Sequence, residues 1–262
     1  MNKKIILCAL FLVFISSTCL AQSLSLDSLI AKVQENQGLL RDMQADITTT
    51  ISSPMQKEPM VQKGHIWSKG SDKSKIEISE PMKQTTIMNG TKMLMEMNGQ
   101  KTVQDLSKMG NKGFGADQGK MSLEKAKEYF DLSVKQGTGD SGQPARIASQ
   151  SEAGGLTGYI VTGIPKQKND FLGKMEFYID PGKFVPTRIA IYNGKGKLIT
   201  TSVIEYMSAE VSTKADSEIS GIWVPIKNIS NVTMPTGSMS IEQVFENVKV
   251  NAGIKDSVFA IE

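Results

Sequence analysis

The order of apolar and polar residues along the chain predicts a short helix followed mainly by β-strands. Between Leu26 and Val33, apolar residues recur at the spacing of one helical face, which predicts a helix over residues 26–37. Gly38 is expected to cap the C-terminus of this helix. From Met43 to Ile51 apolar and polar residues alternate, which is the repeat of a half-buried strand.

Similar alternation and turn chemistry fill most of the remaining chain. Asn89-Gly90 and Asn98-Gly99 are hairpin signals, because both residue types tolerate the positive φ of tight turns. A second short helix is predicted over residues 122–130. The further strands are predicted at 62–69, 75–79, 84–88, 91–97, 101–105, 145–151, 157–163, 172–179, 185–192, 197–208, 222–230 and 238–248. The fold class is therefore mainly β: an incomplete antiparallel β-barrel, or half-barrel, of about eleven or twelve strands with a small helical lid.

The first residues differ from the rest of the chain. Lys3 and Lys4 precede an apolar run of eleven residues, and small residues follow as far as Ala21. This pattern predicts a secretory signal peptide over residues 1–21, cleaved after Ala21. The protein is then periplasmic, with one domain over residues 22–262. The minor alternative is a lipid anchor on Cys19, whose preceding residues suit lipoprotein processing poorly.

Composition excludes several classes of function. Cys8 and Cys19 are the only cysteines, so the chain after residue 21 has no disulfide, cysteine nucleophile or thiolate metal site. Without Lys3 and Lys4, 28 basic residues face 27 acidic ones, and a nucleic-acid binder normally has a concentrated basic excess. We expect a monomer that binds no nucleic acid.

Catalytic chemistry has little support in the sequence. His65 is the only histidine, and no carboxylates at metal-binding spacing accompany it. No Gly-x-Ser-x-Gly nucleophile elbow occurs. We therefore expect no enzyme, no catalytic residue, no metal and no cofactor. A lipid-ester hydrolase that uses His65 is the rival within the enzyme class.

Methionine gives the positive signal. Fourteen of the fifteen methionines follow residue 21, and Met88, Met93, Met95 and Met97 cluster on adjacent predicted strands. Methionine is flexible and polarisable, so it adapts to ligands of variable shape. Aromatic residues make up only 6% of the chain, which argues against recognition by stacking. A curled sheet with soft aliphatic walls is suited to an apolar ligand.

Several segments resemble LolA-type periplasmic lipoprotein carriers. Residues 43–49 (MQADITT) resemble the aromatic-x-Ala-x-Phe-Thr-Gln strand that follows the first helix of these carriers. Residues 64–69 (GHIWSK) are similar to their Gly-x-Leu-Trp-x-Lys strand, and residues 75–81 (KIEISEP) to the next strand. Residues 87–95 (IMNGTKMLM) resemble the hairpin Val-x-Asp-Gly-x-x-Leu-Trp. Segments 177–180, 186–191 and 254–259 resemble the C-terminal part of the superfamily, so the likeness covers most of the chain in order.

The resemblance implies an incomplete barrel closed by helices around an apolar cavity. It implies a carrier that accepts acyl chains of lipoproteins from an inner-membrane ABC exporter and delivers them to an outer-membrane receptor. Gly70 stands where the resemblance implies a cavity arginine that ties the lid, and Ser74 stands near its phenylalanine.

We therefore expect a periplasmic carrier of acylated lipoproteins or lipids, with the helices at 26–37 and 122–130 as its lid. Alternation selects twelve candidate wall residues for the acyl or lipid cavity: Met43, Ile47, Ile51, Ile76, Ile78, Ile87, Met93, Met95, Met175, Phe177, Ile189 and Ile191. The alternative from another class is an envelope sensor or binding module of the same fold that recognises a lipoprotein or protein partner without transporting it.

Overall fold

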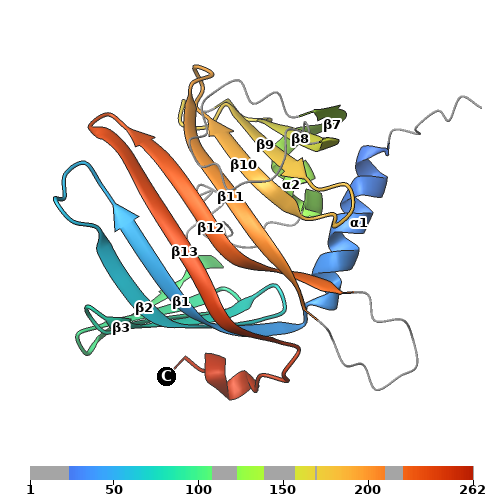
Figure 1. Ribbon diagram of the computed structural model, residues 1–262. Coiled ribbons are helices and arrows are strands. Elements are labelled where there is room, and N and C mark those ends of the chain that lie inside the picture. The colour runs from blue at the N-terminus through green and yellow to red at the C-terminus, as the bar shows by residue number, and fades with distance from the viewer. Residues whose placement is uncertain (1–23, 108–122, 139–156, 169, 210–220, 262) are drawn as a thin grey trace, which may run out of the picture.

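In the described part of the chain, thirteen strands form one antiparallel sheet that curls on itself without closing (Figure 1). The computed structural model describes residues 24–107, 123–138, 157–168, 170–209 and 221–261. The strand order is β6-β5-β4-β3-β2-β1-β13-β12-β11-β10-β9-β8-β7, so β6 and β7 are the two edges. The strands are β1 Asp42–Ser52, β2 Met60–Lys69, β3 Lys73–Glu80, β4 Gln84–Asn89, β5 Lys92–Met97, β6 Gln100–Asp105, β7 Phe130–Thr138, β8 Thr157–Pro165, β9 Lys174–Ile179, β10 Pro186–Tyr192, β11 Leu198–Ala209, β12 Ile222–Met234 and β13 Gly237–Val250. The predicted fold class, a mainly β half-barrel, is confirmed.

The two helices are close to their predicted positions. Helix α1 spans Leu26–Leu39 and α2 spans Leu123–Tyr129. The Oγ of Ser25 accepts a hydrogen bond from the Ser28 amide at 3.2 Å and caps the start of α1. The expectation that Gly38 caps the end of α1 is wrong: Gly38 lies inside the helix, and the cap is Leu40, whose amide bonds to the Gln37 carbonyl.

One hydrophobic core lies between α1 and the far half of the sheet. Leu29 and Val33 of α1 are buried against Val161 of β8 and Ile179 of β9. Phe177 packs against the same group. Full burial of each such side chain stabilises the fold by about 1.5–3 kcal/mol, so this contact holds α1 on the sheet.

A second core lies on the other side of the sheet, beneath the C-terminus. The short 3₁₀ helix η2, Asp256–Phe259, brings Phe259 against Ile87 of β4 and Leu94 of β5. Asn89 donates from Nδ2 to the Phe259 carbonyl at 3.1 Å. The Nζ of Lys69 reaches both the Ile254 carbonyl and the Asp256 carboxylate. The chain end is thus fixed to the outer face of the first strands.

The strand register divides the side chains between the two faces of the sheet. We call the face that carries α1 the concave face, and the face that carries η2 the convex face (Figure 1). In β1 the concave face holds Met43, Ala45, Ile47 and Thr49, all buried. Gly64 of β2 lies opposite Ile47. Only glycine fits at position 64, because a Cβ on this residue would lie 2.0 Å from the Glu77 carbonyl oxygen.

The strand β7 is a correction to the prediction, which ended a helix at residue 130 and placed no strand after it. Phe130, Leu132 and Val134 alternate with polar residues and pair with β8. The predicted strand at 145–151, the signal peptide at 1–21, and Cys8 and Cys19 lie outside the described residues. In the described ranges no helix is long and apolar enough to cross a membrane.

Candidate functional site

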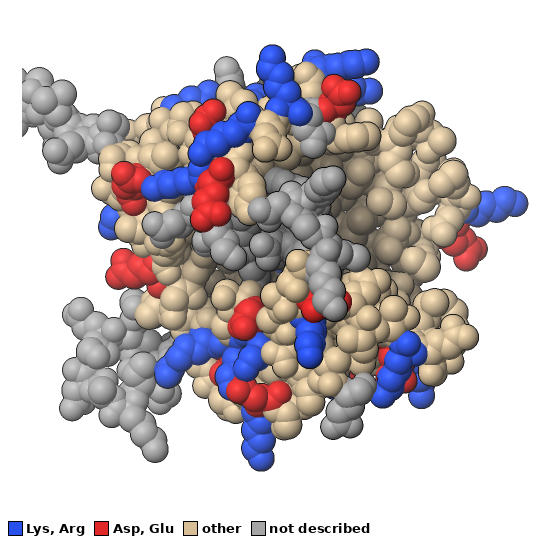
Figure 2. Space-filling model, turned by 180° about the vertical axis from the view of Figure 1, so that it is seen from behind, with Lys and Arg blue, Asp and Glu red and all other residues tan. Residues whose placement is uncertain are grey.

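The concave face forms a hollow, which is the best candidate for a binding site. Seen from behind in Figure 2, a recess opens to the right of the centre, and its visible walls carry neither acidic nor basic side chains. The register places eleven of the twelve predicted wall residues on this concave face. They are Met43, Ile47, Ile51, Ile76, Ile78, Met93, Met95, Met175, Phe177, Ile189 and Ile191. The alternation of apolar and polar residues therefore identified the concave side of β1, β3, β5, β9 and β10 correctly.

Ile87 is the exception, and its assignment to the cavity wall is wrong. In the β4–β5 ladder Ile87 is opposite Leu94, whereas Thr86 is opposite Met95. Ile87 therefore points to the convex face, where η2 covers it. The pattern misled because β4 has one apolar residue on each face, Ile87 on the convex face and Met88 on the concave face, so alternation within β4 does not identify the inner one.

Methionines line the β4–β5 end of the hollow. Met88 and Met93 are directly opposite each other on the concave face, and Met95 and Met97 follow along β5. Met95 and Met97 are 40% and 49% exposed, so their thioethers are accessible. An apolar ligand could contact these flexible side chains without needing one fixed shape.

A polar stripe crosses the centre of the concave face, and the sequence analysis did not identify it. Thr49, Gln243 and Asn228 are consecutive cross-strand neighbours on β1, β13 and β12. The Nδ2 of Asn228 donates to the Gln243 Oε1 at 3.3 Å, while its buried Oδ1 has no hydrogen-bond partner among the described residues. Beside them, the hydroxyls of Ser202 and Ser230 are 2.7 Å apart. The hollow therefore combines apolar walls with polar groups at its centre that can bond to an ester, amide or hydroxyl.

Helix α1 covers the other end of the hollow, the position expected for the predicted lid helix at 26–37. Phe177, one of the predicted wall residues, contacts the buried face of α1. Lys127 of α2 donates from Nζ to Asp27 of α1 at 2.5 Å, so the two helices are linked by an exposed ion pair. A ligand that extended below α1 would have to displace Leu29 and Val33 from the sheet.

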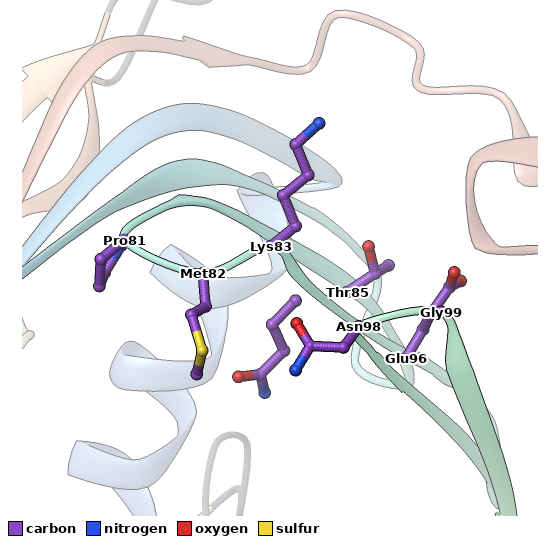
Figure 3. A pocket seen from close by; sticks show the side chains of 8 residues that line it. Pro81, Met82, Lys83, Thr85, Glu96, Asn98 and Gly99 are labelled. Carbon is purple, nitrogen blue, oxygen red and sulfur yellow. The ribbon is translucent and has the colours of Figure 1, made fainter.

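Six described strand connections lie together at one edge of the sheet, which we call the loop edge: residues 53–59, 81–83, 98–99, 166–173 without residue 169, 193–197 and 235–236. Antiparallel pairing places alternate connections at the same edge, and Figure 1 shows three of these turns along the upper left, away from α1. A cleft of about 570 Å³ between Met82, Lys83, Glu96 and Asn98 lies here (Figure 3). Another, of about 450 Å³, is lined by Ile164, Lys168, Asp170, Leu172 and Gly194, among others.

The convex face holds the ionisable clusters. The Nδ1 of His65 is 2.7 Å from the Asp46 Oδ1, and Asn247 donates to the other oxygen of that carboxylate. The hydrogen bonds from Asn247 and His65 lower the pKa of Asp46. Both His65 and Asp46 point away from the hollow, so His65 cannot act on a ligand bound there. The described residues include no group of three or more acidic, histidine or cysteine side chains placed to hold a metal.

A second convex cluster surrounds Glu176 on β9. Its carboxylate accepts hydrogen bonds from Lys174 at 2.9 Å, Tyr192 at 3.0 Å and Tyr178 at 3.2 Å. Burial opposes the charge, but these donors outweigh it and the pKa of Glu176 is lowered. Burial and the neighbouring carboxylate raise the pKa of both tyrosines. Because every partner is internal, we assign the cluster to the stability of β9 and β10.

Gly70 lies in the turn between β2 and β3 with φ +59°. Its amide donates to the Arg41 carbonyl at 2.8 Å. This left-handed conformation disfavours an arginine, and the turn lies at the end of the sheet. The position that the family resemblance assigns to a cavity arginine thus has a turn function in this chain.

Comparisons with known proteins place this architecture among LolA-like structures. The chain is 15% identical, with a TM-score of 0.58, to a LolA superfamily protein from Nitrosomonas europaea, over 90% of this chain and 98% of that one. The same identity and TM-score hold for an outer membrane lipoprotein-sorting protein domain from Vibrio parahaemolyticus, over 88% and 95%. They hold too for a DUF1329 family protein from Desulfovibrio piger, over 89% and 96%. A scan of protein-family models and a search of curated proteins gave no match.

Proposed function

Starting from its LolA-like fold, we propose that this protein binds the acyl chains of lipoproteins, or a lipid, in the hollow. It would carry them across the periplasm towards the outer membrane. The observation that carries the proposal is the composition of the concave face, where β1, β3, β5, β9 and β10 all present aliphatic or thioether side chains. The domain over residues 22–262, after removal of the signal peptide at 1–21, would be the working carrier. An inner-membrane ABC exporter and an outer-membrane receptor would be its partners.

The energetics require such a container. Exposing an acyl chain to water costs about 0.8 kcal/mol per methylene, so a lipid-modified protein does not cross the periplasm unaided. The concave face can replace water by dispersion contacts, which are individually weak. Weak contacts suit a carrier, since it must also release its cargo.

The polar stripe supports an amphipathic cargo over a pure hydrocarbon. Asn228, whose Oδ1 has no partner among the described residues, and Ser230 lie between the methionine end and the α1 end of the hollow. A polar group buried without a partner costs free energy, so an ester or amide of the cargo is favoured at this place. The acyl chains would extend from there along the apolar walls.

The second candidate is a binding module that recognises a lipoprotein or protein partner without transport. The observation that favours it is the open sheet, because among the described strands β6 and β7 each have a neighbour on one side only. An extended partner segment can pair with such an edge. Such a module would bind its partner whether or not acyl chains are attached.

Displacement of a fluorescent fatty acid, combined with native mass spectrometry of protein purified from membranes, tests the proposal. We expect saturable binding of the probe, its displacement by a synthetic diacylated lipopeptide, and acylated species that co-purify. The same peptide without acyl chains is the control. Absence of both probe binding and co-purifying acylated species would contradict the carrier, and equal binding of the two peptides would favour the binding module.

A further inference from the structure

The loop edge has an unusual share of exposed apolar side chains. Phe171 in the connection between β8 and β9 is 84% exposed, and Met55 between β1 and β2 is 73% exposed. Met82, at 56%, follows β3, and Met97 ends β5 at the same edge. Phe171, Met55 and Met82 come from three separate connections, and Met97 comes from the end of a strand. The loop edge therefore presents exposed apolar side chains from several parts of the sheet.

The loop edge is also basic. Its described residues include six exposed lysines and only two carboxylates, Glu58 and Asp170. The lysines are Lys57, Lys83, Lys166, Lys168, Lys195 and Lys197. Within the part of the chain that the structure describes, none of the six forms an ion pair with a carboxylate, so their charge is available to a partner.

The described connections at the opposite edge of the sheet differ in both respects. In these connections, at 40–41, 70–72, 90–91, 106–107, 180–185 and 251–255, three basic residues (Arg41, Lys183 and Lys255) face two acidic ones (Asp72 and Asp180), against six and two at the loop edge. None of the large apolar residues exposed by more than a third lies in these connections. The charge and the apolar projections are thus properties of one edge, and a general excess of lysine does not explain them.

Two of the basic connections are held together as a unit. The Gly194 amide donates to the Asp170 carbonyl at 3.0 Å, which joins the turn at 193–197 to the connection at 166–173. The Nζ of Lys166 donates to the Lys127 carbonyl of α2 at 2.6 Å. Two connections bonded to each other thus carry exposed Phe171 together with Lys168, Lys195 and Lys197.

We propose that the loop edge docks onto an anionic lipid bilayer, with Phe171, Met55 and Met82 in the interface and the lysines against headgroup phosphates. A bilayer fits better than a protein partner, because it requires no shape complementarity and accepts separate apolar projections with cations between them. A protein interface would favour a contiguous packed patch. The inference extends the proposed function, since a carrier that docks by this edge brings the methionine end of its hollow to the membrane.

Vesicle co-sedimentation of the full mature chain tests the inference. The vesicles contain phosphatidylcholine alone or phosphatidylcholine with phosphatidylglycerol. We expect binding to the anionic vesicles that weakens as salt is added. The double variant Lys195→Gln/Lys197→Gln should bind about 30-fold more weakly, because each lysine near an anionic surface contributes about a five-fold effect. Phe171→Ser should weaken binding about ten-fold.

Matched controls separate docking from general charge and hydrophobicity. Lys92→Gln/Lys135→Gln removes two exposed lysines away from the loop edge, and Val103→Ser removes an apolar side chain that is 54% exposed on the convex face. Both should bind vesicles as the wild type does. No binding to anionic vesicles, equal binding to neutral ones, or equal losses in the controls would each overturn the inference.

The failure of docking and the failure of the carrier function remain distinguishable. Fatty-acid displacement is measured without vesicles, and the loop-edge variants should leave it unchanged. A wild-type protein that displaces the fatty acid but ignores anionic vesicles contradicts docking alone. A protein that binds the vesicles but not the fatty acid contradicts the carrier alone.

Discussion

Replacing Met95 by aspartate probes the role of the concave face. Met95 lies on β5 between Met93 and Met97 on the concave face, and 40% of it is exposed, so the new carboxylate remains hydrated and the fold tolerates it. A hydrated carboxylate keeps about three methylenes of an acyl chain away from the wall. At about 0.8 kcal/mol for each methylene, the loss is about 2.4 kcal/mol. We therefore expect acyl-chain affinity to fall about 50-fold.

The assay is titration of a fluorescent fatty acid, with unfolding measured on the same samples. Val103→Asp is the matched control, because it introduces the same charge at an exposed apolar position of the neighbouring strand β6, on the convex face. It should change affinity by less than about two-fold, and Met95→Leu should retain binding. Equal losses in Met95→Asp and Val103→Asp would refute the assignment of the concave face as the binding surface.

Three further predictions concern the fold that supports the hollow. Gly64→Ala should destabilise the protein by more than about 2 kcal/mol in urea unfolding, because its Cβ meets the Glu77 carbonyl. A Cβ at Gly38 of α1 would meet open space, so Gly38→Ala should stabilise the protein by up to about 1 kcal/mol. A greater loss of stability from Gly38→Ala than from Gly64→Ala would contradict the structure. Phe259→Ala should cost about 3–5 kcal/mol, whereas Lys255→Ala, at an exposed position just before η2, should be nearly neutral. Folding lowers the pKa of Glu176, so its ionised carboxylate adds to the free energy of unfolding. This contribution is complete above the unfolded pKa near 4.5 and is lost as the pH falls through the folded pKa. Glu176→Gln should cost about 1–2 kcal/mol at neutral pH and show a smaller acid dependence, and an unchanged pH profile would count against the cluster.

The phase of most strands could be predicted because one face of each strand is polar. In β9, Lys174 and Glu176 alternate with Met175 and Phe177, so the apolar set identified the concave face directly. In β4 this rule failed at Ile87, since η2 supplies a second apolar environment from the far end of the chain. A contact between residues so distant in sequence has no local signal.

Other features depended on tertiary contacts in the same way. The strand β7 begins directly after α2, and its alternation at Phe130, Leu132 and Val134 gains meaning only through pairing with β8. The polar stripe forms because register brings Asn228 beside Gln243, which are fifteen positions apart on different strands. The loop edge likewise collects lysines that are scattered along the sequence.

The central claim is that acyl chains lie against the concave face, and adjacent positions on one strand test it most directly. Ile76 and Glu77 of β3 point to opposite faces, with Ile76 opposite Ile66 and Glu77 opposite His65. A photoreactive amino acid at each position, irradiated in cells that make acylated lipoproteins, reports which face contacts the chains. The account predicts crosslinks to acylated species from position 76 and almost none from position 77. Equal crosslinking from both positions, or crosslinking from position 77 alone, would contradict it.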